Sequence, residues 1–413
     1  MGEIIEKIIQ SKRIAGEEVF EEAVVPVYSL SKNGKVIPAR TSHVYRGKTN
    51  SIVEIELSSG RRIKVTPKHP LLVMNRYGKI EWKLPSEINN KMKIAVPRTI
   101  DFKENRVNER DVLLAELLGY IVADGSIYIN PKDGSGYVAF HNKNSELRSR
   151  VKLLFQLIYG VEAKEEFPKG RTPRIRVNHK EIVEDIARKS CVHGRKARIV
   201  RIPAFIWKSR KTLALFLRAY TDADGTIDNI GVLINTASKS MAFDLLYAFN
   251  IFGIIARLKE KRTREHTYYN VTISGQKQLK AFMTSIGLFH PKKKSAIMKL
   301  LKHDPDMNID TIYIPQSLRR ILPKLSKHLS RRLTRAEKRL ILEKERMSVE
   351  MFNNIIAKLF PSFQRLLIDI EERLSILRNP VNISMNEVLE ELNPLKVSTR
   401  RRFRVFEYKN RHR

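Results

Sequence analysis

Two aspartates, Asp124 and Asp224, share a sequence context that favours metal chemistry. Each closes an apolar, helix-like run in Ala-Asp-Gly, first in LLGYIVADG and again in LRAYTDADG. Two carboxylates brought side by side repel each other unless a proton or a cation lies between them. Carboxylate oxygens suit a hard divalent cation such as Mg²⁺, which also binds substrate phosphates. One such run is more simply a helix end, but the second copy favours a paired-carboxylate metal site.

The two runs open an internal repeat. Asp124 is followed by the strand-like YVAFHNKNSE, the helix-like LRSRVKLLFQLIYGV, the strand RIRVN and the basic CVHGRKARI. Asp224 is followed in the same order by GVLINTASKS, AFDLLYAFNIFGII, YYNVTIS and LFHPKKKSAI. Two copies of one unit predict a pseudo-two-fold monomer in which the first helices pack together and the two aspartates meet.

Small residues support close packing of these two helices. They recur at four-residue spacing on one helix face, Gly119 with Ala123 and Ala219 with Ala223. Small side chains there allow two helix backbones to approach closely. Gly125 and Gly225 are predicted to end the helices as left-handed caps.

The charge balance predicts a polyanionic partner. The chain has 413 residues, with 78 Lys and Arg against 44 Asp and Glu, a formal net charge of +34. Such an excess usually accompanies nucleic-acid binding, although a solvated basic surface or ribosome association would give the same count. The single cysteine, Cys191, excludes an internal disulfide framework and a multi-cysteine zinc site. The sequence shows no apolar membrane span and no leader, so a cytoplasmic, nucleoid-associated protein is expected.

Three consecutive regions are predicted. Residues 1–105 alternate apolar and polar positions with turns such as Ser59-Gly60, which predicts an all-β domain. Residues 106–300 mix helix and strand patterns and hold the repeat. Residues 301–413 are dominated by basic helical patterns such as SLRRILPKLSKHLSRRLTRAEKR and by the basic STRRRFRVFEYKNRHR. This last region is predicted to be either an accessory DNA-binding domain or a helical packing domain with solvated charges.

The repeat resembles the single-chain LAGLIDADG homing endonucleases. The matching positions are Leu117, Gly119 and Ala123-Asp124-Gly125 in the first motif, and Leu217 and Asp222-Ala223-Asp224-Gly225 in the second. Two positions depart from the pattern. Val122 stands where the first motif often has an acid, and Arg218 replaces a usual small residue of the second.

This resemblance implies a fold, an activity and a metal site. The fold is an α+β core of two αββαββα repeats with saddle-shaped sheets. The activity is the cutting of both strands of a long, specific duplex DNA site by phosphodiester hydrolysis with Mg²⁺ or Mn²⁺. Asp124 and Asp224 are the implied catalytic metal ligands, and Gly125 and Gly225 lie beside them at the metal site.

Basic residues near the end of each repeat are implied to lie close to the cleaved phosphates. Lys196 and Lys293 occupy corresponding places and are candidate catalytic residues, with plain phosphate anchoring an equal alternative. Many relatives have a lysine where this chain has Val200. Further DNA contacts are predicted on the strand RIRVN and in the two basic clusters, from Arg174, Arg176, Arg198, Arg201, Lys292 and Lys294.

The first region carries a second resemblance, to the Hint domain of inteins. GRRIKVTPKHPLLV is similar to the Thr-x-x-His block of self-splicing domains, with Thr66 and His69 in the matching places. In that family these residues assist the acyl shift at the upstream splice junction. The chain starts at Met1 without an upstream Cys or Ser nucleophile and ends in VFEYKNRHR without a terminal His-Asn. Splicing by this chain alone is therefore not expected, and the region is predicted to be a partial Hint domain.

The function expected from the sequence is thus an intein-derived, metal-dependent DNA endonuclease acting as a monomer on double-stranded DNA. Two alternatives belong to other classes. One is a LAGLIDADG protein that binds DNA or RNA without cutting it, as a regulator or a maturase. The other is a protein-splicing element. Retention of both Asp124 and Asp224 disfavours the first, and the departures at the two termini disfavour the second.

Overall fold

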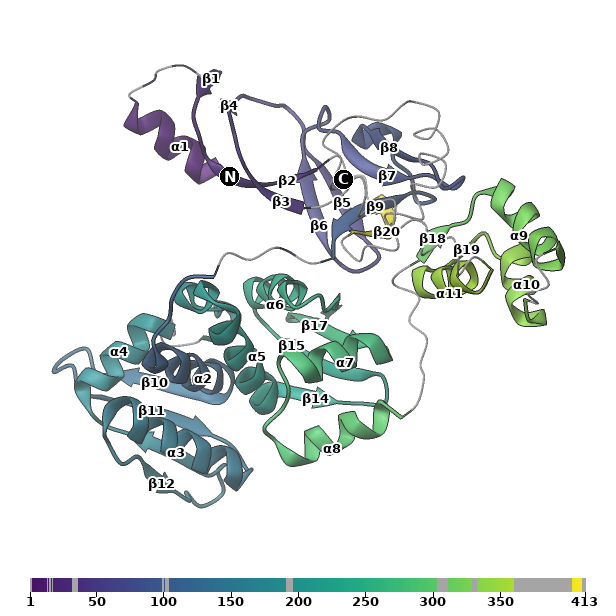
Figure 1. Cartoon of the computed structure of the whole chain (residues 1–413). Coiled ribbons are helices and arrows are strands. Elements are labelled where there is room, and N and C mark those ends of the chain that lie inside the picture. Colours follow the sequence, from purple (N-terminus) through teal and green to yellow (C-terminus); the bar gives the residue numbers. More distant parts are fainter. Residues whose placement is uncertain are drawn as a thin grey trace. The chain divides into compact units, whose positions relative to one another are not determined.

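The computed structural model of the protein shows two compact units (Figure 1). The structure describes residues 2–12, 14, 16, 18–31, 36–98, 100, 104–190, 196–302, 311–328, 333–359 and 403–410. One unit combines Met1–Asp101 with Asn308–Arg413, and the other is Phe102–Met307. The prediction of three consecutive domains is thereby corrected, because the C-terminal region folds into the same unit as the N-terminal one. In sequence, the second unit is an insertion into the first.

The second unit contains the predicted repeat. The first copy runs α2 (Glu109–Asp124), β10 (Gly125–Ile129), β11 (Gly136–His141), α3 (Ser145–Tyr159), β12 (Lys164–Glu166), β13 (Arg174–Val177) and α4 (Lys180–Ser190). The second runs α5 (Arg210–Asp224), β14 (Gly225–Ile227), β15 (Gly231–Thr236), α6 (Lys239–Ile251), β16 (Arg257–Arg262), β17 (Thr267–Ser274) and α7 (Gln276–Ser285), followed by α8 (Pro291–Leu300). The short helices η2 (Lys196–Arg198) and η3 (Ala204–Lys208) join the copies. The αββαββα order is confirmed in both.

The sheets of the two copies have the same topology. Their antiparallel strand orders are β10-β11-β13-β12 and β14-β15-β17-β16. Polar caps mark where the helices begin, because a side-chain oxygen accepts a bond from an otherwise unpaired N–H of the first turn. Asn108 caps α2, Asn144 caps α3, Ser209 caps α5 and Ser238 caps α6. The equivalent caps therefore start equivalent elements in both repeats.

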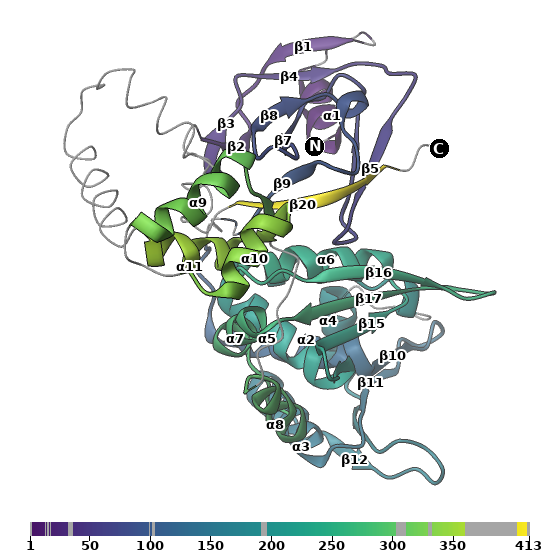
Figure 2. The same ribbon diagram turned by 90° about the vertical axis from the view of Figure 1, so that its right-hand side faces the viewer.

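Helices α2 and α5 pack directly against each other at the centre of this unit (Figures 1 and 2). The two helices approach closely at Gly119, since a Cβ atom added there would lie 2.6 Å from the carbonyl oxygen of Phe216 and 2.7 Å from the Cβ of Ala219. Ala219 and the neighbouring Leu117 and Leu217 are fully buried in one core that spans both repeats. The predicted role of small residues in close helix packing is confirmed at Gly119 and Ala219.

Gly125 and Gly225 do not adopt the predicted left-handed conformation. Their φ angles are −92° and −76°, in the extended region, because each is both the end of a helix and the first residue of a strand. Glycine is required there by space. A Cβ atom would lie 2.5 Å from the carbonyl oxygen of Ile121 in the first repeat and 2.6 Å from that of Thr221 in the second.

The first unit is built around a six-stranded sheet. Its N-terminal elements are α1 (Gly2–Ser11), β1 (Val19–Glu22), β2 (Pro26–Leu30), β3 (Val36–Arg40), β4 (His43–Arg46), β5 (Val53–Leu57), β6 (Arg62–Val65), β7 (Leu71–Met74), β8 (Ile80–Lys83), η1 (Pro85–Glu87) and β9 (Lys93–Pro97). The sheet order is β6-β5-β20-β9-β7-β8, and β1–β4 and β2–β3 form separate two-stranded ribbons. The predicted turn at Ser59-Gly60 joins β5 and β6, with Gly60 at a φ of 80°.

Strand β20 (Phe403–Asn410) comes from the far end of the chain and pairs antiparallel with both β5 and β9 (drawn in yellow in Figure 2). The prediction of a helical C-terminal region is therefore wrong for residues 403–410. Apolar and polar residues largely alternate in FRVFEYKN, which suits a strand. Residues 403–407 pair with β9, and residues 408–410 pair with β5. Residues 360–402, which contain the predicted helix FQRLLIDIEERLSILRN, lie outside the described residues.

The described residues 311–328 and 333–359 form helices and two short strands that pack on the β-sheet of the same unit. These elements are β18 (Thr311–Tyr313), α9 (Gln316–His328), α10 (Arg335–Glu343), β19 (Arg346–Ser348) and α11 (Val349–Leu359). Their apolar core includes Met74 of β7. The buried Lys93 of β9 donates to Thr311 Oγ1 at 2.9 Å and lies over the Tyr313 ring. These contacts make the region a packing partner of the sheet.

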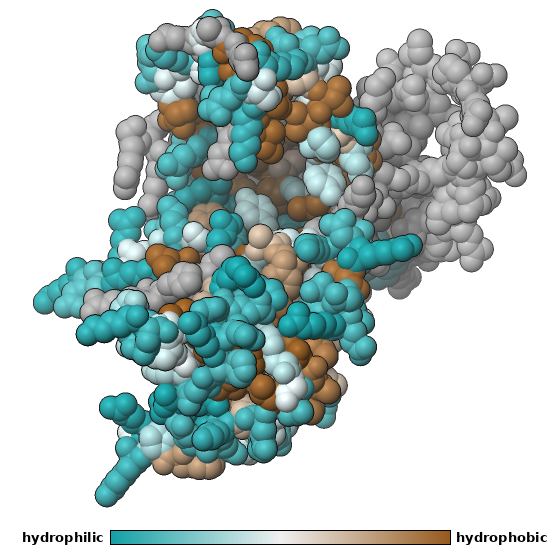
Figure 3. Space-filling model, turned by 90° about the vertical axis from the view of Figure 1, so that its left-hand side faces the viewer, coloured by the Kyte–Doolittle hydropathy of each residue, from teal (hydrophilic) through white to brown (hydrophobic). Residues whose placement is uncertain are grey.

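Much of the surface drawn in Figure 3 is hydrophilic, and apolar side chains occur there in smaller groups. None of the helices in the described ranges is both long and apolar enough to cross a bilayer.

We predict that Gly119→Ala destabilises the Phe102–Met307 unit by about 1–3 kcal/mol, because the new methyl group overpacks the helix contact. In an uncrowded helix the same change would stabilise by about 1 kcal/mol. The measurement is urea unfolding followed by Trp207 fluorescence in a Trp82→Phe background, since these are the two tryptophans of the chain. Gln156→Ala, at an exposed position of α3, is the control. A variant as stable as the parent would contradict the close contact.

Candidate active site at the ends of two packed helices

Asp124 and Asp224 are the last residues of the paired helices α2 and α5, and both are partly buried. Both carboxylates act on the same two side chains: each favours the charged form of Lys293, and each raises the pKa of Tyr220. Both aspartates therefore act on the same neighbourhood at the ends of two helices that pack together. That the two carboxylates form one metal site stays a prediction.

Each aspartate has a polar neighbour that orients it. Asn142, just beyond the end of β11, donates its Nδ2 hydrogen to Asp124 Oδ2 at 3.0 Å. The hydroxyl of Tyr220 donates to Asp224 Oδ2 at 3.4 Å. Burial, and next the Asp224 charge, raise the pKa of Tyr220, so its hydroxyl stays a neutral donor. Neither Asn142 nor Tyr220 was predicted from the sequence.

Lys293 reaches the end of α5 from the first turn of α8. Its Nζ donates to the carbonyl oxygens of Thr221, Asp222 and Ala223, at 3.1, 2.6 and 3.4 Å. Burial lowers the pKa of Lys293, while the carboxylates of Asp222, Asp124 and Asp224 oppose that shift. The predicted catalytic lysine of the second repeat therefore lies at the helix end that carries Asp224.

Lys196, its predicted counterpart, begins η2, and its side chain lies outside the described residues. Its role stays a prediction.

Asp222 is a residue whose role the sequence did not reveal. Its carboxylate is 1% exposed and accepts bonds from the backbone N–H groups of Phe289 and His290, at 2.9 Å each. Burial raises the pKa of Asp222 from its ordinary 3.8 to about 6, against the effect of the two backbone bonds. The only sequence signal was the acid itself, two positions before Asp224, where the first repeat has Val122.

A buried ion cluster also links the repeats. Glu116 of α2 accepts two bonds from Arg150 of α3, at 2.9 and 2.7 Å, and lies 3.3 Å from Arg218 of α5. The side chain of Glu116 is 1% exposed. Arg218 thus departs from the motif because it supplies a second cation to a buried carboxylate across the helix pair, which offsets the cost of burying that charge.

The predicted DNA-contacting residues are spread over the Phe102–Met307 unit. Arg174 and Arg176 lie two positions apart on β13, the first 2.6 Å from Glu166 and the second over the Tyr137 ring at 4.3 Å. Arg198 contacts His266 at 2.7 Å. The remaining three differ in availability: Arg201 is paired with Asp244, whereas Lys292 and Lys294 are exposed on α8.

Thr66 and His69, the splicing-related pair, lie in the other unit. They occupy an exposed turn between β6 and β7, where the backbone N–H of His69 donates to the carbonyl oxygen of Thr66 at 3.0 Å.

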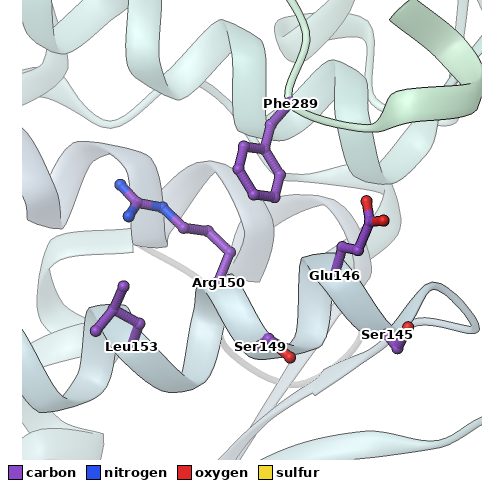
Figure 4. Close-up of a pocket in the computed structure, with 6 residues that line it drawn as sticks. All are labelled: Ser145, Glu146, Ser149, Arg150, Leu153 and Phe289. Carbon is purple, nitrogen blue, oxygen red and sulfur yellow. The ribbon is translucent and has the colours of Figure 1, made fainter.

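A pocket of about 440 Å³ opens beside α3 (Figure 4). Phe289, in the segment that precedes α8, lines one side of the pocket. The other lining residues belong to α3: Ser145, Glu146, Ser149, Arg150 and Leu153. Asp124 and Asp224 do not line this pocket, so it is separate from the candidate metal site.

The two aspartates suit a hard divalent cation. Both are oxygen donors at helix C-termini, where the helix dipoles add further negative potential. In the described ranges, no group of three or more His, Cys, Asp and Glu side chains forms a metal site. A cation held by two carboxylates keeps other positions for water and phosphate oxygens, as Mg²⁺ commonly does.

The free energy of unfolding should decrease as pH rises, because the pKa of Asp222 is raised in the folded state. Since its pKa is raised to about 6 from 3.8, the folded state binds the proton more tightly than the unfolded chain. The stability that this provides is present at low pH and is lost as pH rises from about 4 to about 6. We therefore predict that the stability of wild type relative to Asp222→Asn falls by up to about 3 kcal/mol between pH 4 and pH 7.

The measurement is urea unfolding of metal-free protein, again followed by Trp207 in the Trp82→Phe background. A wild-type advantage that stays constant or grows with pH would show that the pKa of Asp222 is not raised in the folded state.

Comparison with known proteins agrees with the repeat. A family model described as LAGLIDADG-like domain matches residues 111–190 and 211–287. The replication factor C small subunit of Methanocaldococcus jannaschii is 34% identical in an alignment that covers 99% of this chain and 21% of that protein. An A-type ATP synthase subunit of Pyrococcus abyssi is 32% identical over 65% of this chain and 28% of its own length. The chain therefore spans a fifth to under a third of these relatives.

Among solved structures, the homing endonuclease I-DmoI in complex with DNA and Ca aligns with 46% of this chain and all of its own, at 17% identity and a TM-score of 0.36. The family match falls on the two αββαββα copies, each of which begins with one of the paired helices. Residues 111–190 and 211–287 of this chain form a LAGLIDADG-like domain.

Proposed function

We propose that the protein is an intein-derived, site-specific DNA endonuclease that cuts both strands with Mg²⁺ or Mn²⁺. The observation that carries the proposal is that Asp124 and Asp224 end two helices that pack together and that both act on Lys293, in a strongly basic chain. Each helix leads directly into a four-stranded sheet that bears arginines, such as β13 with Arg174 and Arg176. Ribbons of this kind fit the major groove of DNA, while Lys and Arg hold the phosphates.

The residues of this site would have different roles in phosphodiester hydrolysis. Asp124 and Asp224 would hold the cation, and Asn142 and Tyr220 fix the orientation of these carboxylates through their hydrogen bonds. When bound, the divalent cation supplies Lewis-acid polarisation of the phosphate and lowers the pKa of water. Lys293 places a cation near the same helix end and would stabilise charge on the phosphate.

The intein origin is supported by both architecture and relatives. The β-rich unit is discontinuous, with strand β20 from the end of the chain between β5 and β9, and the LAGLIDADG-like domain lies between its two sequence segments. Nearly all of this chain matches a segment of a replication factor, and 65% of it matches a segment of an ATP synthase protein with a different name. An inserted element explains that distribution. We assign Thr66 and His69 to its splicing half.

One observation favours the non-cleaving alternative. All three Lys293 bonds go to backbone carbonyl oxygens, as expected of a lysine that only caps a helix. A protein that binds nucleic acid without cutting it would need no more than this cap. Both carboxylates would then be dispensable for binding, so substitution of the aspartates distinguishes the two functions.

The unit that holds β20 offers a further basic surface. Arg320, Lys324 and Lys327 are exposed on one face of α9, at i, i+4 and i+7. None of the three pairs with an acidic side chain in the described part of the chain. We propose that this face, here called the α9 basic face, adds phosphate contacts to the DNA footprint. The protein would act as a monomer on nucleoid DNA in the cytoplasm, because one chain supplies both aspartates.

We predict that Asp124→Asn and Asp224→Asn each reduce double-strand cleavage by orders of magnitude while preserving DNA affinity. Asn keeps the size of the side chain but removes the charge that would hold the cation. Loss of a negative charge near the DNA phosphates favours DNA binding. The substrate is a duplex selected for tight binding from a random-sequence library, so that its choice does not depend on cleavage. Gel shifts and Mg²⁺ cleavage are measured on the same preparations.

Titration calorimetry with Mn²⁺ gives a readout besides activity, and both variants should bind the ion more weakly. Full cleavage by either variant would refute the paired-aspartate mechanism. Wild-type protein that binds the selected duplex but never cuts it would support the non-cleaving alternative.

DNA binding should weaken steeply with salt, because each phosphate contact releases counterions, with a slope of about −0.9 per contact on a log–log plot. We predict that Arg320→Gln, Lys324→Gln and Lys327→Gln together make the slope shallower by about 2 to 3. The matched control replaces Lys7, Lys68 and Lys91, which are exposed on other parts of the same unit. Equal slopes for wild type and the α9 variant would exclude the α9 basic face from the footprint.

A further inference from the structure

Polar contacts form a closed ring at the end of α5 in the second repeat. The buried carboxylate of Asp222 accepts two hydrogen bonds from the backbone of Phe289 and His290. Pro291 begins α8 immediately afterwards, and in its first turn Lys293 reaches back to three carbonyl oxygens at the end of α5. Asp222 of α5 thus accepts hydrogen bonds from the segment before α8, and Lys293 of α8 donates hydrogen bonds back to the end of α5.

Asp222 holds the backbone of the segment before α8. Bonds from backbone N–H groups to a carboxylate are charge-assisted and strong, and loss of the acceptor leaves two partly buried donors unpaired. Lys293 follows His290 by three residues at the start of a helix, so the backbone at 289–290 fixes where the base of the lysine side chain starts. The position of the Lys293 ammonium group therefore depends on Asp222.

The first repeat cannot form the same tie. Its residue at the position of Asp222 is Val122, which is 3% exposed and has no side-chain atom that accepts a hydrogen bond. Tyr120 and Tyr220, which occupy equivalent positions in the two repeats, also differ. Tyr220 donates to Asp224, whereas the hydroxyl of Tyr120 is buried without a hydrogen-bond partner among the described residues. The two repeats share helices and strands but differ in the polar contacts around their aspartates.

We infer that Asp222 is a positioning residue for Lys293 and that it makes the two DNA-cutting half-sites unequal. This inference rests on the proposed endonuclease function. A group held in place before substrate binds avoids reorganisation during the reaction, and a misplacement of about 1 Å can cost about 100-fold in rate. The strand whose phosphate lies beside Lys293 is therefore cut first, and a duplex nicked in that strand accumulates before the second cut.

The test measures each strand separately. The selected duplex carries a different dye on each 5′ end, and single-turnover cleavage in Mg²⁺ gives one rate per strand. Wild type should cut the strands at unequal rates, and Lys293→Met should identify the strand beside the lysine by slowing it. Asp222→Asn should slow that same strand by about 10- to 100-fold and leave the other nearly unchanged.

The double variant, Asp222→Asn with Lys293→Met, should be no slower on that strand than Lys293→Met alone, because the two residues act as one unit. Asp228→Asn is the matched control. Asp228 also accepts two backbone N–H bonds, from Ile230 and Gly231 in the turn between β14 and β15, but it lies away from Lys293 in sequence and contacts. It should change neither rate.

Equal slowing of both strands by Asp222→Asn would mean a general structural role and would overturn the inference, as would equal strand rates in wild type. Hydrogen exchange, followed by mass spectrometry over residues 287–295, gives a readout that needs no cleavage. Exchange there should be slow in wild type, faster in Asp222→Asn and unchanged in Asp228→Asn.

These two readouts separate the possible failures. If wild type binds the selected duplex and cuts neither strand, the endonuclease proposal fails, and exchange still decides whether Asp222 holds the segment before α8. If Asp222→Asn does not fold, rapid exchange at Phe289 and His290 in wild type overturns the inference and slow exchange supports it.

Discussion

The contact between α2 and α5 at Gly119 is the constraint on which the rest of the site depends. Each helix carries its aspartate as its last residue and passes directly into a strand, so the separation of the helix backbones sets the separation of the carboxylates. A side chain at Gly119 would meet backbone of the partner helix, which cannot move without moving a whole repeat. The fully buried Leu117, Leu217 and Ala219 hold the pair in that position through one core shared by both repeats.

Close packing of two helix ends also concentrates negative charge. The negative groups there differ in the partners that stabilise them. The carbonyl oxygens at the end of α5 receive the ammonium group of Lys293, and Glu116 deeper in the helix pair receives two arginines. Asp222 has two backbone donors, yet burial still raises its pKa. Asp124 and Asp224 are partly exposed and have neutral polar neighbours in Asn142 and Tyr220. Among these carboxylates, the charge that is best placed to be neutralised by a bound cation is therefore that of the two motif aspartates.

The sequence contained the parts of this fold that are local or periodic. The repeat, the strand and helix order, the small residues at the helix contact and the two motif aspartates all follow from patterns within short windows. Contacts between distant residues were not readable in this way. The N–H groups that bind Asp222 are 67 and 68 residues away, and β20 pairs with β5 across most of the chain. Gly125 and Gly225 were misassigned for a local reason, because a strand that starts without a connecting loop needs an extended residue and not a left-handed one.

A single chain with two repeats can become asymmetric in a way that a symmetric dimer cannot. In a homodimer one substitution appears in both halves, whereas here Val122 and Asp222 occupy equivalent positions with opposite chemistry. The helix contact tolerates this difference because both side chains are buried at the flank of their helix and leave the packing of Gly119 against Ala219 intact. The helix contact is built from equivalent backbone positions in both repeats, while the polar contacts around each aspartate differ. The helix contact must therefore stay equivalent in the two repeats, whereas the polar contacts around the aspartates can differ.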